Sequence, residues 1–247
     1  MNRSMTAEEK LKIASFLNIA EDYSRDGFHR VRTPSSFSDD AQSSAGAAAS
    51  VESAATNDSL SNIAEEVKAC SRCRLASGRT NAVPGEGVDH PLVMVIGEGP
   101  GADEDASGRP FVGKAGQLLD RMLSSIGLSR ETNCFIANVV KCRPPQNRDP
   151  EADETAACSG FLDRQIALLR PKVILTVGRV PTQNILKTNE GIGRLRGKFV
   201  DFRGIPLLPT YHPSALLRDE NLKRPAWEDL KLLRERLGGD LVNDRSV

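Results

Sequence analysis

Residues 92–101 of this chain read LVMVIGEGPG, an apolar run that stops at a glycine-rich loop. Such a short run is typical of a strand buried on both faces, as in a parallel sheet. Similar runs recur in CFIANVV (134–140) and KVILTVG (172–178), and FVDF (199–202) and PLLPTYH (206–212) are the final predicted strands.

Stretches with apolar residues at helical spacing separate these strands. One of them, 114–127, places five such residues on one face: Leu118, Leu119, Met122, Leu123 and Ile126. Further helices are predicted at about 153–169, after Pro181, and at 225–237. This alternation predicts a layered α/β domain with a mainly parallel sheet. Ligands bind such sheets beyond the carboxyl ends of the strands, so we expect the site in the loops that follow the strands.

The first sixty residues differ from the rest of the chain. Residues 6–22 repeat apolar side chains at helical spacing, and we expect a helical extension over 1–33. Between Pro34 and Leu60, 15 of 27 residues are Ser or Ala, so we expect a flexible linker over 34–59 and the main domain over 60–247. A partner for the extension is not indicated.

Composition is that of a soluble globular protein, with 39% hydrophobic and 27% charged residues. No apolar run approaches the roughly 20 residues of a membrane helix, and no secretory signal is recognisable. We therefore expect a cytoplasmic, bacterial-type location and no membrane partner. The zero net charge divides unevenly: residues 1–60 hold 6 basic and 9 acidic side chains, which leaves 27 basic and 24 acidic in the remainder. This charge permits limited contact with phosphates and does not by itself predict nucleic-acid binding.

Three loops and one strand end carry candidate chemistry. GEGPGADED (97–105) lets the backbone approach a ligand closely, although a solvated acidic turn is the alternative. GRPFVGKAGQLL (108–119) offers the ring of Phe111 for stacking a base, unless that ring belongs to the core. HPSALLR (212–218) begins with His212, which can donate a hydrogen bond to a leaving group, and Asn138 can read the edge of an extruded base.

Five cysteines are present, an odd number that fits a metal site better than a disulfide framework. Cys70 and Cys73 form a C-x2-C pair, and Cys142 and Cys158 are separated by fifteen residues. Cys134 falls within a predicted strand and is left over. Four thiolates can hold either zinc or a 4Fe–4S cluster, and the spacing alone slightly favours zinc.

Four motifs read together resemble the iron–sulfur (family four) uracil-DNA glycosylases. They are G-E-G-P-G-x-x-E-D, G-R-P-F-V-G-x-A-G, N-V-V-K-C-R-P-P-x-N-R-x-P and H-P-S-x-L-L-R, in this order, and the resemblance spans about residues 63–236. It implies a three-layer α/β/α sandwich around a central four-stranded, mainly parallel sheet. It also implies one 4Fe–4S cluster, held by Cys70, Cys73, Cys142 and Cys158.

The resemblance further implies a monomeric, monofunctional glycosylase that flips uracil out of single- or double-stranded DNA, U·G mismatches included, and leaves an abasic site. The implied catalytic residues are Glu98, His212 and, as a second choice of carboxylate, Glu104. The implied uracil pocket consists of Glu98, Gly99, Phe111, Asn138 and His212. The implied DNA contacts are Arg143, Arg148, Ser214, Leu216, Leu217 and Arg218, and Lys141 lies in the same basic loop.

This sequence departs from the better-known uracil glycosylases at one position, because Gly99 stands where they carry an aspartate. The group that activates water is therefore left open between Glu98 and Glu104. GRLRGKFVDF (193–202) has no histidine, unlike a covalent-trapping branch of the superfamily. Two alternatives remain at this point: an accessory DNA-binding module without catalysis, and a glycosylase for another lesion such as hypoxanthine or mismatched thymine.

Overall fold

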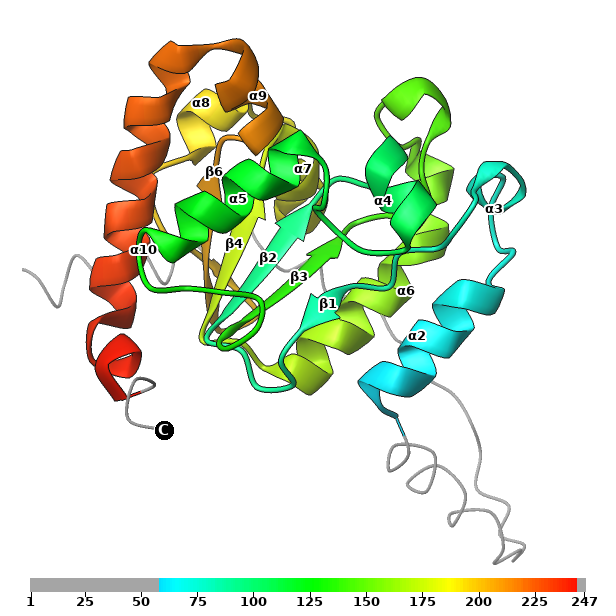
Figure 1. Ribbon diagram of the computed structural model, residues 1–247, viewed down its shortest axis with the longest axis horizontal. Helices are drawn as coiled ribbons and strands as arrows, with labels where there is room; N and C mark the ends of the chain where they lie inside the picture. Colours follow the sequence, from blue (N-terminus) through cyan, green and yellow to red (C-terminus); the bar gives the residue numbers. More distant parts are fainter. Residues whose placement is uncertain (1–57, 244–247) are drawn as a thin grey trace, which may run out of the picture. The chain divides into compact units, whose positions relative to one another are not determined.

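The computed structural model describes residues 58–243 (Figure 1). The expected helical extension over 1–33 and nearly all of the expected linker lie outside these residues. The last two linker residues belong to the folded domain. Asp58 forms an ion pair with Arg164, 2.7 Å between Oδ1 and Nη2, and Ser59 caps the first described helix by accepting a hydrogen bond from the Asn62 amide.

Six strands form one mixed sheet in the order β1-β3-β2-β4-β6-β5. Their bounds are β1 Glu86–Gly87, β2 Val93–Gly97, β3 Cys134–Asn138, β4 Val173–Val177, β5 Val200–Phe202 and β6 Ile205–Thr210. The four central strands are mutually parallel, as the sequence predicts. They are the four-stranded parallel sheet that the resemblance implies, and β1 and β5 pair antiparallel at its two edges, of which only β5 is predicted from the sequence. β1 has only two residues, too short a signal to recognise in the sequence.

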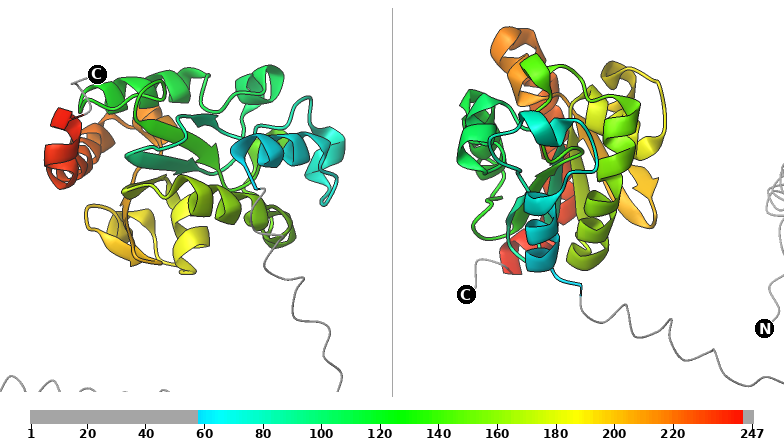
Figure 2. Two further views of the ribbon diagram at one scale, coloured as in Figure 1. Left: turned by 90° about the horizontal axis from the view of Figure 1, so that it is seen from below. Right: turned by 90° about the vertical axis from the view of Figure 1, so that its right-hand side faces the viewer.

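Helices cover both faces of the sheet (Figure 2). The longer ones are α2 Leu60–Ala69, α5 Lys114–Ser124, α6 Ala152–Leu169, α7 Arg179–Leu186 and α10 Lys223–Asn243. The shorter ones are α3 Leu75–Gly78, α4 Ala102–Ser107, η2 Pro145–Asn147, α8 Ile192–Leu195, α9 Pro213–Arg218 and η3 Glu220–Leu222. Within the described part of the chain, no helix is both long and apolar enough to cross a bilayer.

Strand β2 supplies side chains to two separate hydrophobic cores. Met94 and Ile96 pack with α2 and α6 on one face, whereas Val93 and Val95 pack with α5 and α10 on the other. This alternation follows from the two-residue period of a strand, and every residue of β2 is buried. The domain is therefore the expected three-layer α/β/α sandwich.

Strand register brings the loops expected to carry chemistry to one edge of the sheet. Gly97, the last residue of β2, lies opposite Asn138, the last residue of β3. Val177 lies opposite Thr210 at the ends of β4 and β6, two residues before His212. The chain segments that follow all four central strands thus open at the same edge.

Candidate active site

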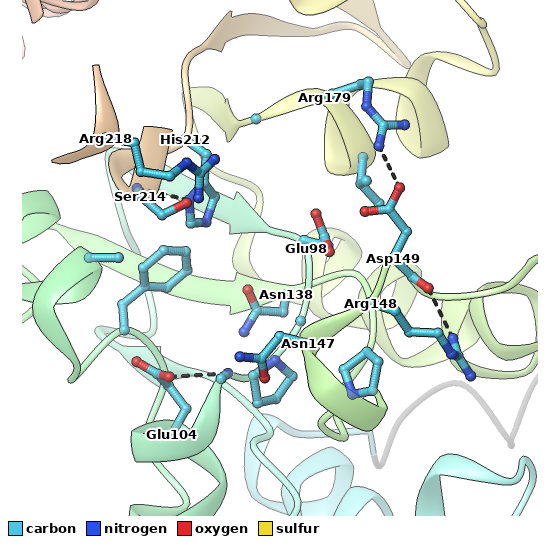
Figure 3. Close-up of a pocket in the computed structure, with 18 residues that line it drawn as sticks. Glu98, Glu104, Asn138, Asn147, Arg148, Asp149, Arg179, His212, Ser214 and Arg218 are labelled. Carbon is cyan, nitrogen blue, oxygen red and sulfur yellow. Dashed lines mark hydrogen bonds and ion pairs between the residues drawn. The ribbon is translucent and has the colours of Figure 1, made fainter. Parts of the chain in front are cut away.

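A cavity of about 490 Å³ opens at this edge (Figure 3). Nine of the site residues predicted from the sequence line it: Glu98, Gly99, Glu104, Phe111, Asn138, Arg148, His212, Ser214 and Arg218. Arg143, Leu216 and Leu217 are not among its lining residues. The structure therefore brings together four loops that are up to about 120 positions apart in the sequence.

Asn138 lines the cavity, and the oxygen of its side-chain amide has no hydrogen-bond partner among the described residues. The residue is only 1% exposed, and its Oδ1 is the one buried side-chain polar atom without a hydrogen-bond partner among the described residues. Leaving such a group unpaired costs about 1–3 kcal/mol. A buried amide oxygen kept free in a cavity lining is a feature that a ligand N–H would satisfy.

Gly97 leaves room for the side chains of Asn138 and Phe111 to pack directly against the main chain. A Cβ at this position would lie 2.4 Å from Oδ1 of Asn138 and 2.5 Å from Cζ of Phe111. Any larger residue would therefore collide with both groups. The ring of Phe111 lies 5.8 Å from the ring of His212, centroid to centroid, at an interplanar angle of 33°. Phe111, Asn138 and His212 thus surround one slot.

His212 is held as a neutral hydrogen-bond donor. It caps α9, and its Nδ1 accepts a hydrogen bond of 3.1 Å from the backbone amide of Ser214. Because an amide can only donate, Nδ1 carries no proton and the neutral ring carries its proton on Nε2. Burial, reinforced by the nearby positive charge of Arg218, lowers the pKa of His212 to about 4. The imidazole is consequently neutral near pH 7.

Glu98 lines the cavity with a carboxyl group whose pKa is raised. Burial is the main cause that raises the pKa of Glu98 to about 7, and the charge of Asp149 raises it further. Arg179 opposes this shift and forms an ion pair with Asp149 beside Glu98 (Figure 3). A carboxyl group with a pKa near the working pH is suited to general-base chemistry.

Glu104, the second carboxylate expected at the site, accepts hydrogen bonds from three backbone amides. Its Oε1 accepts hydrogen bonds from the amides of Val112 and Gly113, at 2.8 and 3.0 Å, and its Oε2 accepts one of 3.1 Å from the amide of Gly101. The carboxylate therefore ties the glycine-rich loop after β2 to the loop of Phe111. Both of its oxygens are thus occupied by backbone donors.

Among the residues expected at the DNA or in the same basic loop, Lys141 and Leu216 are buried, and Arg148 is bound to α6. Lys141 is 1% exposed, and its Nζ donates to the carbonyl of Asn138 and to Oε1 of Gln165. Leu216 is 2% exposed and belongs to the core. Arg148 pairs with the fully buried Glu154 through two hydrogen bonds of 2.7 and 2.8 Å, so its guanidinium fixes the η2 loop to α6.

Leu217 remains as an apolar residue at the surface beside the cavity, with 48% of its surface exposed. Arg143 donates to Oδ1 of Asn147, a residue that lines the cavity. The sequence reasoning missed Asn147, Asp149 and Arg179. The first two lie in the motif N-V-V-K-C-R-P-P-x-N-R-x-P, whereas nothing in the sequence distinguishes Arg179 from other surface arginines.

The four cysteines expected to bind a metal line a second, small cavity, together with Arg79 and Phe161. Two of the sulfur atoms accept hydrogen bonds: Cys142 from Arg79 Nη1 at 3.1 Å, and Cys158 from the backbone amide of Lys141 at 3.3 Å. Cys134 is in the core on the opposite face of the sheet, as its exclusion from the set requires. Among the described residues, no three Cys, His, Asp or Glu side chains are grouped closely enough to hold a single metal ion.

A family model of the uracil DNA glycosylase superfamily matches residues 84–231. This match covers more than half of the chain, and the chain belongs to that superfamily. A type-4 uracil-DNA glycosylase of Sulfurisphaera tokodaii is 51% identical over 187 residues, which is 72% of this chain and 84% of the relative. One of Thermotoga maritima is 43% identical over 173 residues, 68% of this chain and 90% of the relative.

A type-5 uracil-DNA glycosylase of Pyrobaculum aerophilum is 30% identical over 203 residues, 69% of this chain and 88% of the relative. Within the superfamily the chain is therefore grouped with the type-4 proteins. The similar proteins come mostly from archaea, so they lend no support to the expected bacterial-type location.

Proposed function

We propose that this protein removes uracil from DNA by hydrolysing the N-glycosidic bond, and that it leaves an abasic site. The observation that carries this proposal is the unpartnered Oδ1 of Asn138 in a slot bounded by Phe111 and His212. Uracil presents a flat ring, an N3–H donor and two carbonyl oxygens, which match these three groups in kind. The names of the type-4 relatives support the same substrate.

The target nucleotide has to leave the base stack to reach this slot, at a cost of about a few kcal/mol that is lowest at a mismatch. We propose that uracil stacks on Phe111, that Oδ1 of Asn138 accepts its N3–H, and that the amide nitrogen donates to O4. Cytosine has the opposite pattern of donor and acceptor at these two atoms. A buried site built for one pattern rejects the other strongly, because polar groups would be left unpaired.

Bond cleavage leaves negative charge on the departing uracil and positive charge on the sugar. The Nε2–H of neutral His212 would donate a hydrogen bond to O2 of uracil as negative charge grows on that atom. The backbone amide of Gly99 would donate a second hydrogen bond. Preorganised donors of this kind commonly lower the barrier of an enzymatic reaction more than any other single effect. Glu98 would orient the attacking water and stabilise the sugar cation.

No lysine is among the described residues that line the cavity, and Lys141 is buried behind Asn138 with both of its partners fixed. This supports a monofunctional enzyme, since strand cleavage by a covalent route needs an amine at the sugar. We propose Leu217 as the residue that fills the space of the flipped base, with Ser214, Arg218 and Arg143 near the phosphates, in single- or double-stranded DNA and at U·G mismatches.

We also propose that Cys70, Cys73, Cys142 and Cys158 hold one 4Fe–4S cluster. All four line one cavity, and four thiolates are the ligands that such a cluster takes. The N–H donors on Cys142 and Cys158 are typical of thiolate ligands. A bound cluster would tie the α2–α3 loop to α6 and to the loop that follows β3.

The function is tested with an oligonucleotide that contains one uracil, as a single strand and in duplex opposite G or A. We expect free uracil and a strand that breaks only after alkali treatment. Thymine and hypoxanthine at the same position serve as matched controls for the alternative lesions. Binding without release of any base would favour an accessory DNA-binding module.

The pH dependence of the reaction should report Glu98. Because Glu98 acts as a carboxylate and its pKa is raised to about 7, kcat/KM should fall about tenfold per pH unit below that value and level off above it. This decline is the acidic limb of the pH–rate profile. His212, with a pKa of about 4, stays neutral through this range and adds no second limb to the profile. Glu98→Gln should lower the rate at alkaline pH and abolish the limb.

Two further substitutions should shift this limb in opposite directions. Asp149→Asn removes a negative charge that raises the pKa of Glu98, so the limb should move to lower pH. Arg179→Gln removes the opposing charge, so the limb should move to higher pH. A limb that persists in Glu98→Gln would assign the titration to another group.

A further inference from the structure

We propose that Arg130 is a positioning residue for base stacking, because it grips the backbone of Phe111 and thereby holds the ring in place. The inference rests on the proposed function and names a residue outside the cavity lining. Arg130 is in the loop between α5 and β3, nineteen positions along the chain from the residue on which it acts.

The guanidinium of Arg130 is buried against the Phe111 loop. The residue is 6% exposed, its Nη1 donates to the carbonyl of Pro110 at 2.8 Å, and its Nη2 donates to the carbonyl of Phe111 at 2.9 Å. Nε and Nη2 also donate to Oδ1 of Asp120 on α5, at 3.2 and 2.7 Å. One planar group therefore joins two successive carbonyls to a helix of the core.

Phe111 needs such support because its backbone is left-handed, with φ at 53°. This region is disfavoured for a bulky side chain, so the conformation persists only where surrounding contacts impose it. Gly116 of α5 also packs closely against this turn, since a Cβ there would lie 1.9 Å from the carbonyl oxygen of Phe111. The Phe111 carbonyl is thus contacted by both Gly116 and Arg130.

A relaxed turn would move the ring into or out of the slot. Cζ of Phe111 already lies 2.5 Å from the place that a Cβ of residue 97 would take, and the His212 ring is close on another side. Little room separates a well-placed ring from one that blocks the base. A displacement of about 1 Å in such a site can cost roughly a hundredfold in rate.

The charge of Arg130 is matched by its neighbours. Asp120 is its closest ionic partner, and Oε2 of Glu86 lies 3.8 Å from Nη1. Glu86 binds Arg109 more tightly, at 2.6 and 2.9 Å. Arg109 is exposed, and its guanidinium donates to Glu86 rather than to the carbonyls of Pro110 or Phe111, which makes it a matched control within the same charge network.

The test is a double-mutant cycle in single-turnover uracil excision with Arg130→Met, Phe111→Ala and the combined variant. We expect Arg130→Met to lower the rate by roughly ten- to a hundredfold. In the Phe111→Ala background the same substitution should change the rate by less than about threefold, since the group on which it acts is gone. Arg109→Gln should remain within about twofold of the wild type.

The inference would be overturned if the rate losses of Arg130→Met and Phe111→Ala simply multiplied in the combined variant. Full activity of Arg130→Met would overturn it as well. Should Arg130→Met fail to fold, Arg130→Lys keeps a positive charge beside Asp120 but cannot bridge both carbonyls, and it should show the same dependence on Phe111. A wild-type protein that releases no uracil would refute the proposed function instead. The two failures are therefore distinguishable.

Discussion

Asn138→Ala should lower kcat/KM for uracil excision by about a hundredfold to a thousandfold, while affinity for DNA changes only a few-fold. The substitution removes the Oδ1 that has no partner among the described residues and is therefore available to a ligand. The phosphate contacts that we propose lie on other residues and are unaffected. Release of uracil under single-turnover conditions, together with a binding titration on uncleaved DNA, measures both effects.

Asn184→Ala is the matched control for this substitution. Asn184 is part-buried on α7, where its amide donates to the carbonyl of Val180 one turn earlier, and it does not line the cavity. We expect its activity to remain within about twofold of the wild type. An Asn138→Ala variant that excises uracil at the wild-type rate would show that another group recognises the base.

Cys158→Ser should abolish the visible absorption of an iron–sulfur protein and lower the melting temperature by roughly 10 °C. Loss of the cluster that connects three segments should lower the free energy of unfolding by about 3–4 kcal/mol. Each kcal/mol shifts the Tm of a domain of this size by roughly 2–4 °C. Iron and sulfide analysis, visible spectra and thermal unfolding of the purified protein measure these effects.

Cys134→Ser provides the matched control, because Cys134 is as buried as Cys158 but lies in β3 on the other face of the sheet. It should keep the iron content and the spectrum of the wild type. A colourless wild-type protein with one zinc per chain would contradict the cluster. Iron retained in full by Cys158→Ser would instead remove that residue from the ligand set.

Much of the fold could be predicted because the central strands are continuous apolar runs and the helices carry clear amphipathic spacing. Positions at the ends of strands, such as Asn138 and His212, were also predictable, since register in a parallel sheet gathers them at one edge. Of the two antiparallel edge strands, β5 was predicted at 199–202, whereas β1, with only two residues, was not.

The roles of the charged residues could not be predicted, because they depend on partners that are distant in the sequence. Lys141 and Arg148 are the basic residues expected in a DNA-binding loop. In the structure Lys141 donates to Gln165 and Arg148 donates to Glu154, both on α6. Leu216 and Leu217 are identical in type, and only the orientation of α9 separates a core residue from a surface residue. Arg130 lies outside all four motifs recognised in the sequence.

The missing side chain at Gly97 also bears on protein engineering. Any side chain at this position would displace Asn138 and Phe111, the two residues that we propose to hold the base. A library aimed at new base preferences would therefore gain nothing from diversifying this position. Variation at the amide of residue 138 and along the opposite rim, with position 97 left as glycine, is the route by which the substrate range of this scaffold can be redesigned.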